Sequence, residues 1–272
     1  MDLSIIIVSF NTKKLLQECL KSLGTEGEVM VVDNASKDGS AEMVEENFPK
    51  VNLIRNKKNL GFAQAANQAL RKVQAENILF LNSDTRVKPN SLQKLIRFAQ
   101  KQPQLGAVGA RLINPNGSIQ PSVYHFPTLA RAIREYWLGQ KGVYEKYAPK
   151  VKEPIEDEAV TGAAMLVPRK TIEKIGFLNE KYFMYFEDLD FCQRIKQAGL
   201  KVYYLPEAEI LHHHGQSAVK TGPKAYQYLV QSSKIYNGFI KYYLLFSIIW
   251  LGQRWQKFLS RLKDNKSKDP QS

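Results

Sequence analysis

The N-terminal third of the chain alternates short apolar runs with segments whose apolar residues recur every three or four positions. The apolar runs at Leu3–Val8, Glu28–Val32 and Asn77–Leu81 predict strands that are buried on both faces of a sheet. Residues Leu15–Leu23 repeat apolar side chains at helical spacing and predict an amphipathic helix between the first two strands. This order of strand, helix and strand predicts an α/β fold with a parallel sheet and crossover helices.

The remaining elements follow the same two periodicities. Beyond Ala107 the pattern is less regular, with a turn signal at Asn114–Gly117, and it becomes clear again before a cluster of histidines. The further predicted elements are a helix through Met43 and Val44, a strand Asn52–Arg55, a helix Ala63–Val73, a helix after Pro89, strands Ala163–Val167 and Leu200–Leu205, and a helix Glu187–Ala198.

Polar residues stand where the predicted strands end. In open α/β sheets ligands bind at the carboxyl ends of the strands, so Asp33 and Asp84 mark a candidate nucleotide site. A carboxylate at Asp33 is able to accept the imide N–H of uracil or thymine, and one at Asp84 is able to hold Mg²⁺ or Mn²⁺ against a diphosphate. The alternative for Asp33 is a turn that closes its strand, and for Asp84 a cap of the loop.

Three acids, Glu187, Asp188 and Asp190, fall in the first turn of a predicted helix. One of them is able to act as the base that removes a proton from an acceptor hydroxyl. The alternative is compensation of the helix dipole, which makes acids common at this position in any helix.

The histidines are concentrated at His212, His213 and His214. Imidazole is a metal ligand and a donor to phosphate, so this cluster is a second candidate for metal or phosphate binding. Because three adjacent side chains cannot all point into one site, one or two of them are expected to be incidental.

The cysteines, the N-terminus and the charge distribution indicate the cellular compartment and the class of binding partner. Cys19 and Cys192 lie in apolar patterns without metal or disulfide spacing, which predicts buried unpaired thiols and a reducing cytoplasm. The N-terminus predicts a strand and has no signal-peptide cleavage site. Of the net charge of +13, +8 belongs to residues 219–272, so the excess does not spread over a groove for nucleic acid, and no nucleic-acid partner is expected.

The C-terminal segment, residues 219–272, is predicted to be a basic, amphipathic helical extension with a disordered end, attached to a catalytic domain of residues 1–218. The uncharged segment Tyr242–Gly252 is too short to span a bilayer. Three interpretations stay open: a helix lying on the inner face of the plasma membrane, a helix that forms a homodimer, and a helix packed onto the main domain.

With these sites in view, the chain resembles the GT-A glycosyltransferases of family 2, especially the rhamnosyltransferase-like branch. The resemblance extends over about residues 3–240, and its motifs occur in the order of the family. The matching segments are SIIIVSFN at 4–11, VDNASKDGS at 32–40, NLGFAQAAN at 59–67, LNSD at 81–84, TGAAMLVPR at 161–169, FEDLD at 186–190 and HHHGQS at 212–217.

The resemblance implies a Rossmann-like mixed sheet flanked by helices and an inverting transfer of a sugar from a dTDP- or UDP-linked donor to a hydroxyl of a glycan or lipid-linked acceptor. It implies Mn²⁺ or Mg²⁺ as cofactor. The implied roles are Asp188 as catalytic base, Asp84 and His212 as metal ligands, Asp33 at the base or ribose, Gly162 and Ala163 at the sugar, Ser9, Asn11 and Asn67 at the nucleotide, Asn82 at the ribose or a metal-bound water, and Glu187 at the acceptor.

One departure and three alternatives complete this interpretation. Where many relatives carry an Asp-x-Asp metal motif, this chain has Asn82-Ser83-Asp84, which supplies one carboxylate. The segment after the first strand, Ser9–Thr12, contains no glycine, which disfavours a sugar-phosphate nucleotidyltransferase and a dehydrogenase. The remaining alternative is a basic membrane-binding or nucleic-acid-binding protein without catalysis.

Overall fold

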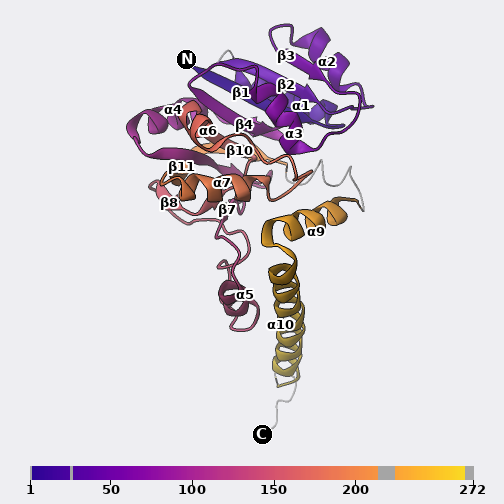
Figure 1. Ribbon diagram of the computed structural model, residues 1–272, viewed down its shortest axis with the longest axis vertical. Coiled ribbons are helices and arrows are strands. Elements are labelled where there is room, and N and C mark those ends of the chain that lie inside the picture. The colour runs from indigo at the N-terminus through magenta and orange to yellow at the C-terminus, as the bar shows by residue number, and fades with distance from the viewer. Residues whose placement is uncertain (1, 25–26, 214–223, 267–272) are drawn as a thin grey trace.

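A mixed sheet of nine strands forms the centre of the main body in the computed structural model, which describes residues 2–24, 27–213 and 224–266 (Figure 1). Eight strands follow the order β3-β2-β1-β4-β10-β6-β11-β5, and β8 pairs with β11 beside this path. A separate two-stranded sheet joins β7 and β9. The strands are β1 (Leu3–Ser9), β2 (Glu28–Asp33), β3 (Asn52–Arg55), β4 (Asn77–Asn82), β5 (Thr85–Val87), β6 (Leu105–Ile113), β7 (Val123–Tyr124), β8 (Ile155–Asp157), β9 (Ala159–Val160), β10 (Ala164–Pro168) and β11 (Lys201–His212).

The first four strands form the parallel half of the sheet. β1 pairs in parallel with β2 and β4, and β2 pairs in parallel with β3, so the carboxyl ends of all four lie at one edge. Ile5, Ile7 and Phe80 are almost completely buried, as expected for strands covered on both faces. The predicted parallel sheet with crossover helices is confirmed for this half.

The other half is mixed. β10 runs antiparallel between β4 and β6, β11 runs parallel to β6, and β5 and β8 add antiparallel to β11. β11 is longer than the predicted strand because it continues through a bulge after Leu205 to His212. This continuation carries a histidine back to the edge where β4 ends.

Helices cover both faces of the sheet. One buried cluster packs α1, α2 and α4 against the sheet, and a second packs α3, α6 and α7 against the opposite face. Cys19 and Cys192 are buried in these two clusters as free thiols, as predicted. The helices are α1 (Lys13–Leu23), α2 (Ser40–Asn47), α3 (Phe62–Leu70), α4 (Ser91–Lys101), α5 (Leu129–Tyr136), α6 (Arg169–Ile175), α7 (Glu187–Gln197), α9 (Lys224–Asn237) and α10 (Phe239–Lys266).

The C-terminal helices leave the main body. α9 lies beneath the sheet domain, and α10 extends away from it alongside α5 (Figure 1). In the part of the chain that the structure describes, neither α10 nor any other helix combines the length and the apolar character needed to cross a membrane. The predicted domain boundary at 218/219 and the motif residues 214–217 lie outside the described residues, as do residues 267–272 at the end of the extension, where disorder is predicted without a stated boundary.

Candidate active site

A cleft of about 910 Å³ opens where the parallel strands end. Val8 and Phe10 line it from the end of β1, and Asn82 lines it from the end of β4. This position agrees with the expectation for an open α/β sheet. The structure brings seven of the predicted site residues to this cleft: Asn82, Asp84, Gly162, Ala163, Glu187, Asp188 and His212.

The cleft lining includes an aspartate and a histidine that face each other. The antiparallel pairing of β5 with β11 sets His212 opposite Thr85, so that His212 Nε2 lies 3.2 Å from Asp84 Oδ1. The backbone N–H of His213 donates to the Asp84 carbonyl, at 2.9 Å, and both Asp84 and His212 are buried. Residues 84 and 212 are therefore held together by backbone pairing, although they are far apart in the sequence.

Gln120 determines which ring nitrogen of His212 faces the aspartate. Gln120 Oε1 lies 2.7 Å from His212 Nδ1, and an amide oxygen only accepts, so Nδ1 carries the proton. In the neutral ring, Nε2 then presents a lone pair to Asp84 Oδ1 and to the Asn82 amide nitrogen, which is 3.3 Å away. Two electron-rich atoms at this separation repel each other unless a proton or a cation lies next to both.

The residues present fit a hard divalent cation. Adjacent ligands of an octahedral ion with bonds of about 2.1 Å are about 3.0 Å apart, close to the separation of the Asp84 and His212 atoms. Within the described residues no group of three or more His, Cys, Asp or Glu side chains gathers here, so protein atoms supply only part of a coordination sphere. A phosphate-binding cation typically completes its shell with substrate oxygens and water.

The cleft lining also includes two acids at the start of α7, Glu187 and Asp188. Asp188 Oδ2 accepts from the Gly162 backbone N–H at 3.1 Å, and Asp188 Oδ1 accepts from the Leu189 N–H at 2.8 Å. These bonds orient the carboxylate beside the Gly162–Ala163 segment, which the resemblance assigns to the sugar. Asp190 is used differently, because it pairs with Arg194 at 2.9 Å one turn further along α7.

Glu187 is a buried acid with an unused oxygen. Its Oε2 is buried without a hydrogen-bond partner among the described residues. Burial, and then the neighbouring Asp188 charge, raise the pKa of Glu187 above the ordinary value of a carboxyl group. A carboxyl that keeps its proton is able to donate a hydrogen bond into the cleft.

The backbone before α7 is bent to present these acids. Tyr185 and Phe186 adopt φ values of 71° and 67°, a left-handed conformation that is costly for residues with a side chain. The same segment touches the start of α3, where the Phe62 N–H donates to the Phe183 carbonyl at 2.7 Å. Gly61 permits this approach, because a Cβ there would lie 2.3 Å from the Phe183 oxygen.

The predicted nucleotide residues lie around the β1 and β2 ends, outside the cleft lining. Asp33 Oδ2 accepts from the Ser36 N–H at 3.0 Å, which is the turn-closing bond considered as its alternative, while its Oδ1 is buried without a partner in the described chain. Asn11 Oδ1 accepts from the Lys37 N–H at 2.7 Å, which ties the two loops together. Ser9 is fully buried and reaches the cleft through Thr12, which donates to Ser83.

Asn67 does not line the cleft. Its amide donates to the Leu178 carbonyl at 2.8 Å and to Glu180 Oε1 at 2.9 Å, and its oxygen accepts from the Leu178 N–H. These bonds fasten α3 to the segment before Tyr182, so the side chain serves the packing of that segment. The structure therefore departs from the nucleotide contact expected of Asn67.

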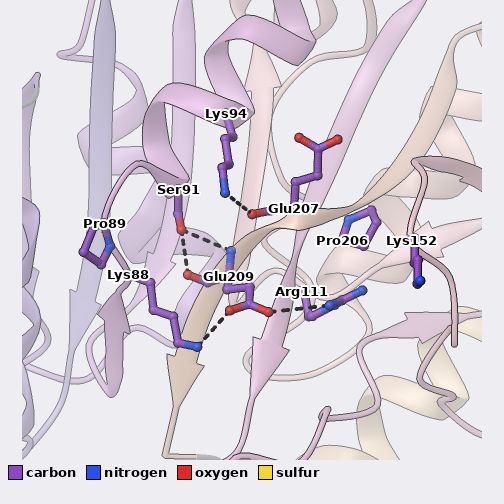
Figure 2. A pocket seen from close by; sticks show the side chains of 9 residues that line it. All are labelled: Lys88, Pro89, Ser91, Lys94, Arg111, Lys152, Pro206, Glu207 and Glu209. Carbon is purple, nitrogen blue, oxygen red and sulfur yellow. Dashed lines mark hydrogen bonds and ion pairs between the residues drawn. The ribbon is translucent and has the colours of Figure 1, made fainter.

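A second, smaller cleft of about 420 Å³ lies at the bulge of β11 (Figure 2). Three of its charges pair with one another: Lys88 Nζ contacts Glu209 at 2.8 Å, and Arg111 reaches the same carboxylate at 3.5 Å (Figure 2). Lys94 donates to the Glu207 carbonyl. This network braces the bulge that allows β11 to continue to His212.

Comparison with known proteins decides the family. Residues 4–175, more than half of the chain, match the family model described as Glycosyl transferase family 2. The chain belongs to glycosyl transferase family 2. The predicted family and the predicted α/β architecture are confirmed.

Family 2 relatives with known names include rhamnosyltransferases. The chain is 29% identical over 236 residues to the N-acetylglucosaminyl-diphospho-decaprenol L-rhamnosyltransferase of Mycobacterium tuberculosis, covering 79% of this chain and 77% of that protein. It is 24% identical over 225 residues to the dTDP-rhamnosyl transferase RfbF of Shigella flexneri, covering 79% and 70%. These relatives support the rhamnosyltransferase-like branch.

The GT-A fold is also found by comparison of structures. The mannosyltransferase PcManGT from Pyrobaculum calidifontis, solved with GDP-Man and Mn²⁺, superposes with a TM-score of 0.58 at 19% identity, covering 92% of this chain and 69% of that one. This family 2 glycosyltransferase therefore has a GT-A fold.

Several residues of the glycosyltransferase cleft had no signal in the sequence. Gln120, Tyr124 and Lys146 line it from the segment that the periodicity left irregular. Lys146 Nζ lies 5.0 Å from the centre of the Tyr124 ring, and Lys146 contributes a positive charge near Glu187. Isolated polar residues in irregular segments carry no periodicity or motif, so only the fold reveals them.

Proposed function

We propose that this enzyme is a metal-dependent, inverting hexosyltransferase of polysaccharide or cell-wall biosynthesis. It transfers a sugar, with L-rhamnose as the first candidate, from a dTDP- or UDP-linked donor to a hydroxyl of a glycan or lipid-linked acceptor. The observation that carries this proposal is the cleft itself, which brings together the facing pair Asp84 and His212 and the carboxylate of Asp188. The names of the rhamnosyltransferase relatives support the choice of sugar.

Asp33, at the end of β2 beside the cleft, is proposed to bind the nucleotide base. Its buried Oδ1 has no partner in the described chain and matches the imide N–H of uracil or thymine, which cytosine lacks. Ser9 and Asn11 are proposed to shape the adjoining loops around the nucleotide, and Asn82 to contact the ribose or a metal-bound water.

Asp84 and His212 are proposed to hold Mn²⁺ or Mg²⁺. When bound there, the cation neutralises the charge that develops on the leaving diphosphate. Gln120 keeps the proton on His212 Nδ1, so Nε2 remains a ligand. This division of roles accounts for a site with one carboxylate where many relatives have two.

Asp188 is proposed as the base. The Gly162 and Leu189 N–H groups orient its carboxylate beside the proposed sugar position, and Gly162 and Ala163 form the wall of that position. The acceptor oxygen loses its proton to Asp188 and attacks the anomeric carbon from the side opposite the departing diphosphate, so the configuration inverts. Glu187, neutral through its raised pKa, donates to an acceptor hydroxyl.

The test is release of nucleoside diphosphate from a panel of dTDP-, UDP-, GDP- and CDP-sugars with Mn²⁺, Mg²⁺ or EDTA, with a membrane extract as the source of acceptor. The proposal expects metal-dependent turnover of a dTDP- or UDP-sugar and no turnover of CDP-sugars. Turnover that EDTA leaves unchanged would overturn the metal assignment, and turnover of only GDP- or CDP-sugars would overturn the base assignment at Asp33. A cytoplasmic location, and contact with a membrane or with a second copy through the C-terminal helices, are part of the proposal.

A further inference from the structure

α10 has one covered face and one open face. On the covered face Gly252 packs directly on α5, because a Cβ there would lie 2.7 Å from the Tyr136 Cβ. Two hydrogen bonds join the same helices: the Trp137 indole donates to the Ile248 carbonyl at 3.0 Å, and the Gln256 amide donates to the Glu135 carbonyl at 2.9 Å. Leu245 is buried on this side. α10 is therefore fixed to the rest of the chain as a projecting arm (Figure 1).

The open face is apolar. Apart from Phe177, all the exposed large apolar side chains of the described residues lie on α5, immediately after it, or on α9 and α10. Contiguous apolar surface of this kind marks an interaction site in a protein. The residues of this face on α10 are Phe239, Ile240, Tyr243, Leu244, Phe246, Trp250, Leu251, Trp255, Phe258 and Leu259.

The positive charge of the arm indicates which kind of partner its open face binds. Residues 224–260 contain five lysines and arginines, Lys224, Lys234, Lys241, Arg254 and Lys257, and no aspartate or glutamate. A second copy of the arm would bring the same positive charge against it, and like charges oppose association. An anionic lipid surface offers the opposite charge together with an apolar layer for tryptophan and phenylalanine.

We propose that the open face of α10 docks this enzyme on the surface of an anionic lipid bilayer. The helix lies in the interface, since it is not apolar enough to cross the membrane. Arg254 stacks over the Trp250 ring, 3.7 Å from its centre, which places a cation and an indole together at the depth where lipid headgroups meet acyl chains.

α9 connects the arm to the cleft beside the start of α7: Ser232 donates to the Met184 carbonyl at 2.8 Å, Tyr228 stacks on Phe183 with ring centres 4.2 Å apart, and Leu229 lines the cleft. An acceptor carried by a membrane lipid would therefore reach a cleft whose wall is joined to the docked arm. This last step rests on the proposed function, whereas the docking does not.

Vesicle flotation of the full chain tests the docking without donor or acceptor. The protein is expected to float with vesicles of phosphatidylglycerol and phosphatidylcholine in equal parts, and to float much less with phosphatidylcholine alone or at high salt. Equal flotation with both vesicles, or none with either, would overturn the proposal.

Matched variants locate the contact. Trp250→Ser is expected to lower the partition coefficient by at least about tenfold through lost apolar burial, whereas Phe177→Ser, an exposed aromatic of the main body, leaves it unchanged. Arg254→Gln with Lys257→Gln is expected to lower it by roughly 25-fold, and Lys57→Gln with Lys58→Gln has no effect. Equal losses in the control pairs would contradict the assignment to α10.

Analytical sedimentation tests whether a second copy of the chain, instead of a lipid surface, covers the open face of α10. A wild-type dimer that Trp250→Ser dissociates, without flotation of the wild type, would show a second copy on this face and overturn the proposal. Nucleoside-diphosphate release in detergent-free buffer is measured on the same variants, so loss of docking is distinguished from loss of catalysis.

Discussion

Two groups of cleft residues are built in opposite ways. In the Asp84–His212 group the polar side chains face one another: Gln120 fixes His212, His212 faces Asp84, and the His213 N–H donates to the Asp84 carbonyl. In the Glu187–Asp188 group at the start of α7, Glu187 is buried with an oxygen that accepts no hydrogen bond from a described residue, after two residues in left-handed conformation. The difference indicates that the first group is organised before ligands arrive, whereas the second leaves hydrogen-bonding capacity for a substrate.

The largest expected effect comes from the base. Asp188→Asn keeps the size of the side chain and one of its two acceptor oxygens but removes its ability to take a proton, so the rate of nucleoside-diphosphate release should fall by about 10²–10⁴-fold. Donor affinity, measured by calorimetry, should stay within a fewfold of wild type. A large loss of donor affinity would show that Asp188 acts in binding the donor instead of in taking the proton.

Gln120→Leu tests whether Gln120 orients His212 in the Asp84–His212 group. Without an acceptor at Nδ1, His212 is free to change its tautomer or rotate, so Mn²⁺ affinity measured by electron paramagnetic resonance titration should fall by about 10–100-fold. Gln120→Glu keeps an acceptor oxygen at this position and should retain binding. Gln104→Leu, at an exposed glutamine, should leave affinity unchanged, and an equal loss there would remove the positioning role of Gln120.

Glu187→Gln tests the buried environment of Glu187 through the pH dependence of the stability of the fold. Because burial and the Asp188 charge raise the pKa of Glu187 in the folded state, the unfolded chain ionises first as pH rises, and the wild type loses stability above the ordinary carboxyl pKa. The melting temperature of Glu187→Gln should equal that of wild type at about pH 4 and exceed it at about pH 8.

Glu180→Gln is the control of opposite sign. Hydrogen bonds from Asn67 and then Arg71 lower the pKa of Glu180, so its stabilising contribution is present above the ordinary carboxyl pKa and is lost as pH falls. This variant should be less stable than wild type at about pH 8 and equal to it at acidic pH. The same sign for both variants would contradict the described environments.

The smallest effect belongs to Asp190. It stands on the same helix as Asp188 but pairs with Arg194 outside the cleft, so Asp190→Asn should change turnover by less than about twofold and stability by about 0.3–0.5 kcal/mol. Turnover and thermal unfolding of this variant measure both. A loss of turnover comparable to that of Asp188→Asn would erase the distinction between the three acids.

The sequence predicted the parallel half of the fold because its strands are continuous apolar runs. β6, in the centre of the mixed half, was missed because Gly106 and Gly109 weaken the strand pattern. Tertiary packing requires both glycines: a Cβ on Gly109 would lie 2.6 Å from Val160, and one on Gly106 would lie 2.2 Å from Ile195. Such a requirement is visible only when distant elements are in place.

The candidate active site, like the fold, was predicted only in part. Asp84 stood out because ligands bind at the carboxyl ends of strands in open α/β sheets, and the roles of Asp188 and His212 followed from motifs that occur in the order of the family. Gln120 and the fixed tautomer of His212 depend on a hydrogen bond between residues 92 positions apart, and no local pattern encodes it. Asn67 fell within a matching motif, yet the fold uses its amide to hold Leu178.

The anomeric configuration of the transferred sugar tests the central claim most directly. If Asp188 deprotonates the acceptor as proposed, and the acceptor attacks opposite the leaving diphosphate, a single displacement must invert the configuration of the donor sugar. Nuclear magnetic resonance of the product glycoside should therefore show the anomer opposite to that of the donor. A product that keeps the donor configuration would contradict a direct displacement driven by Asp188.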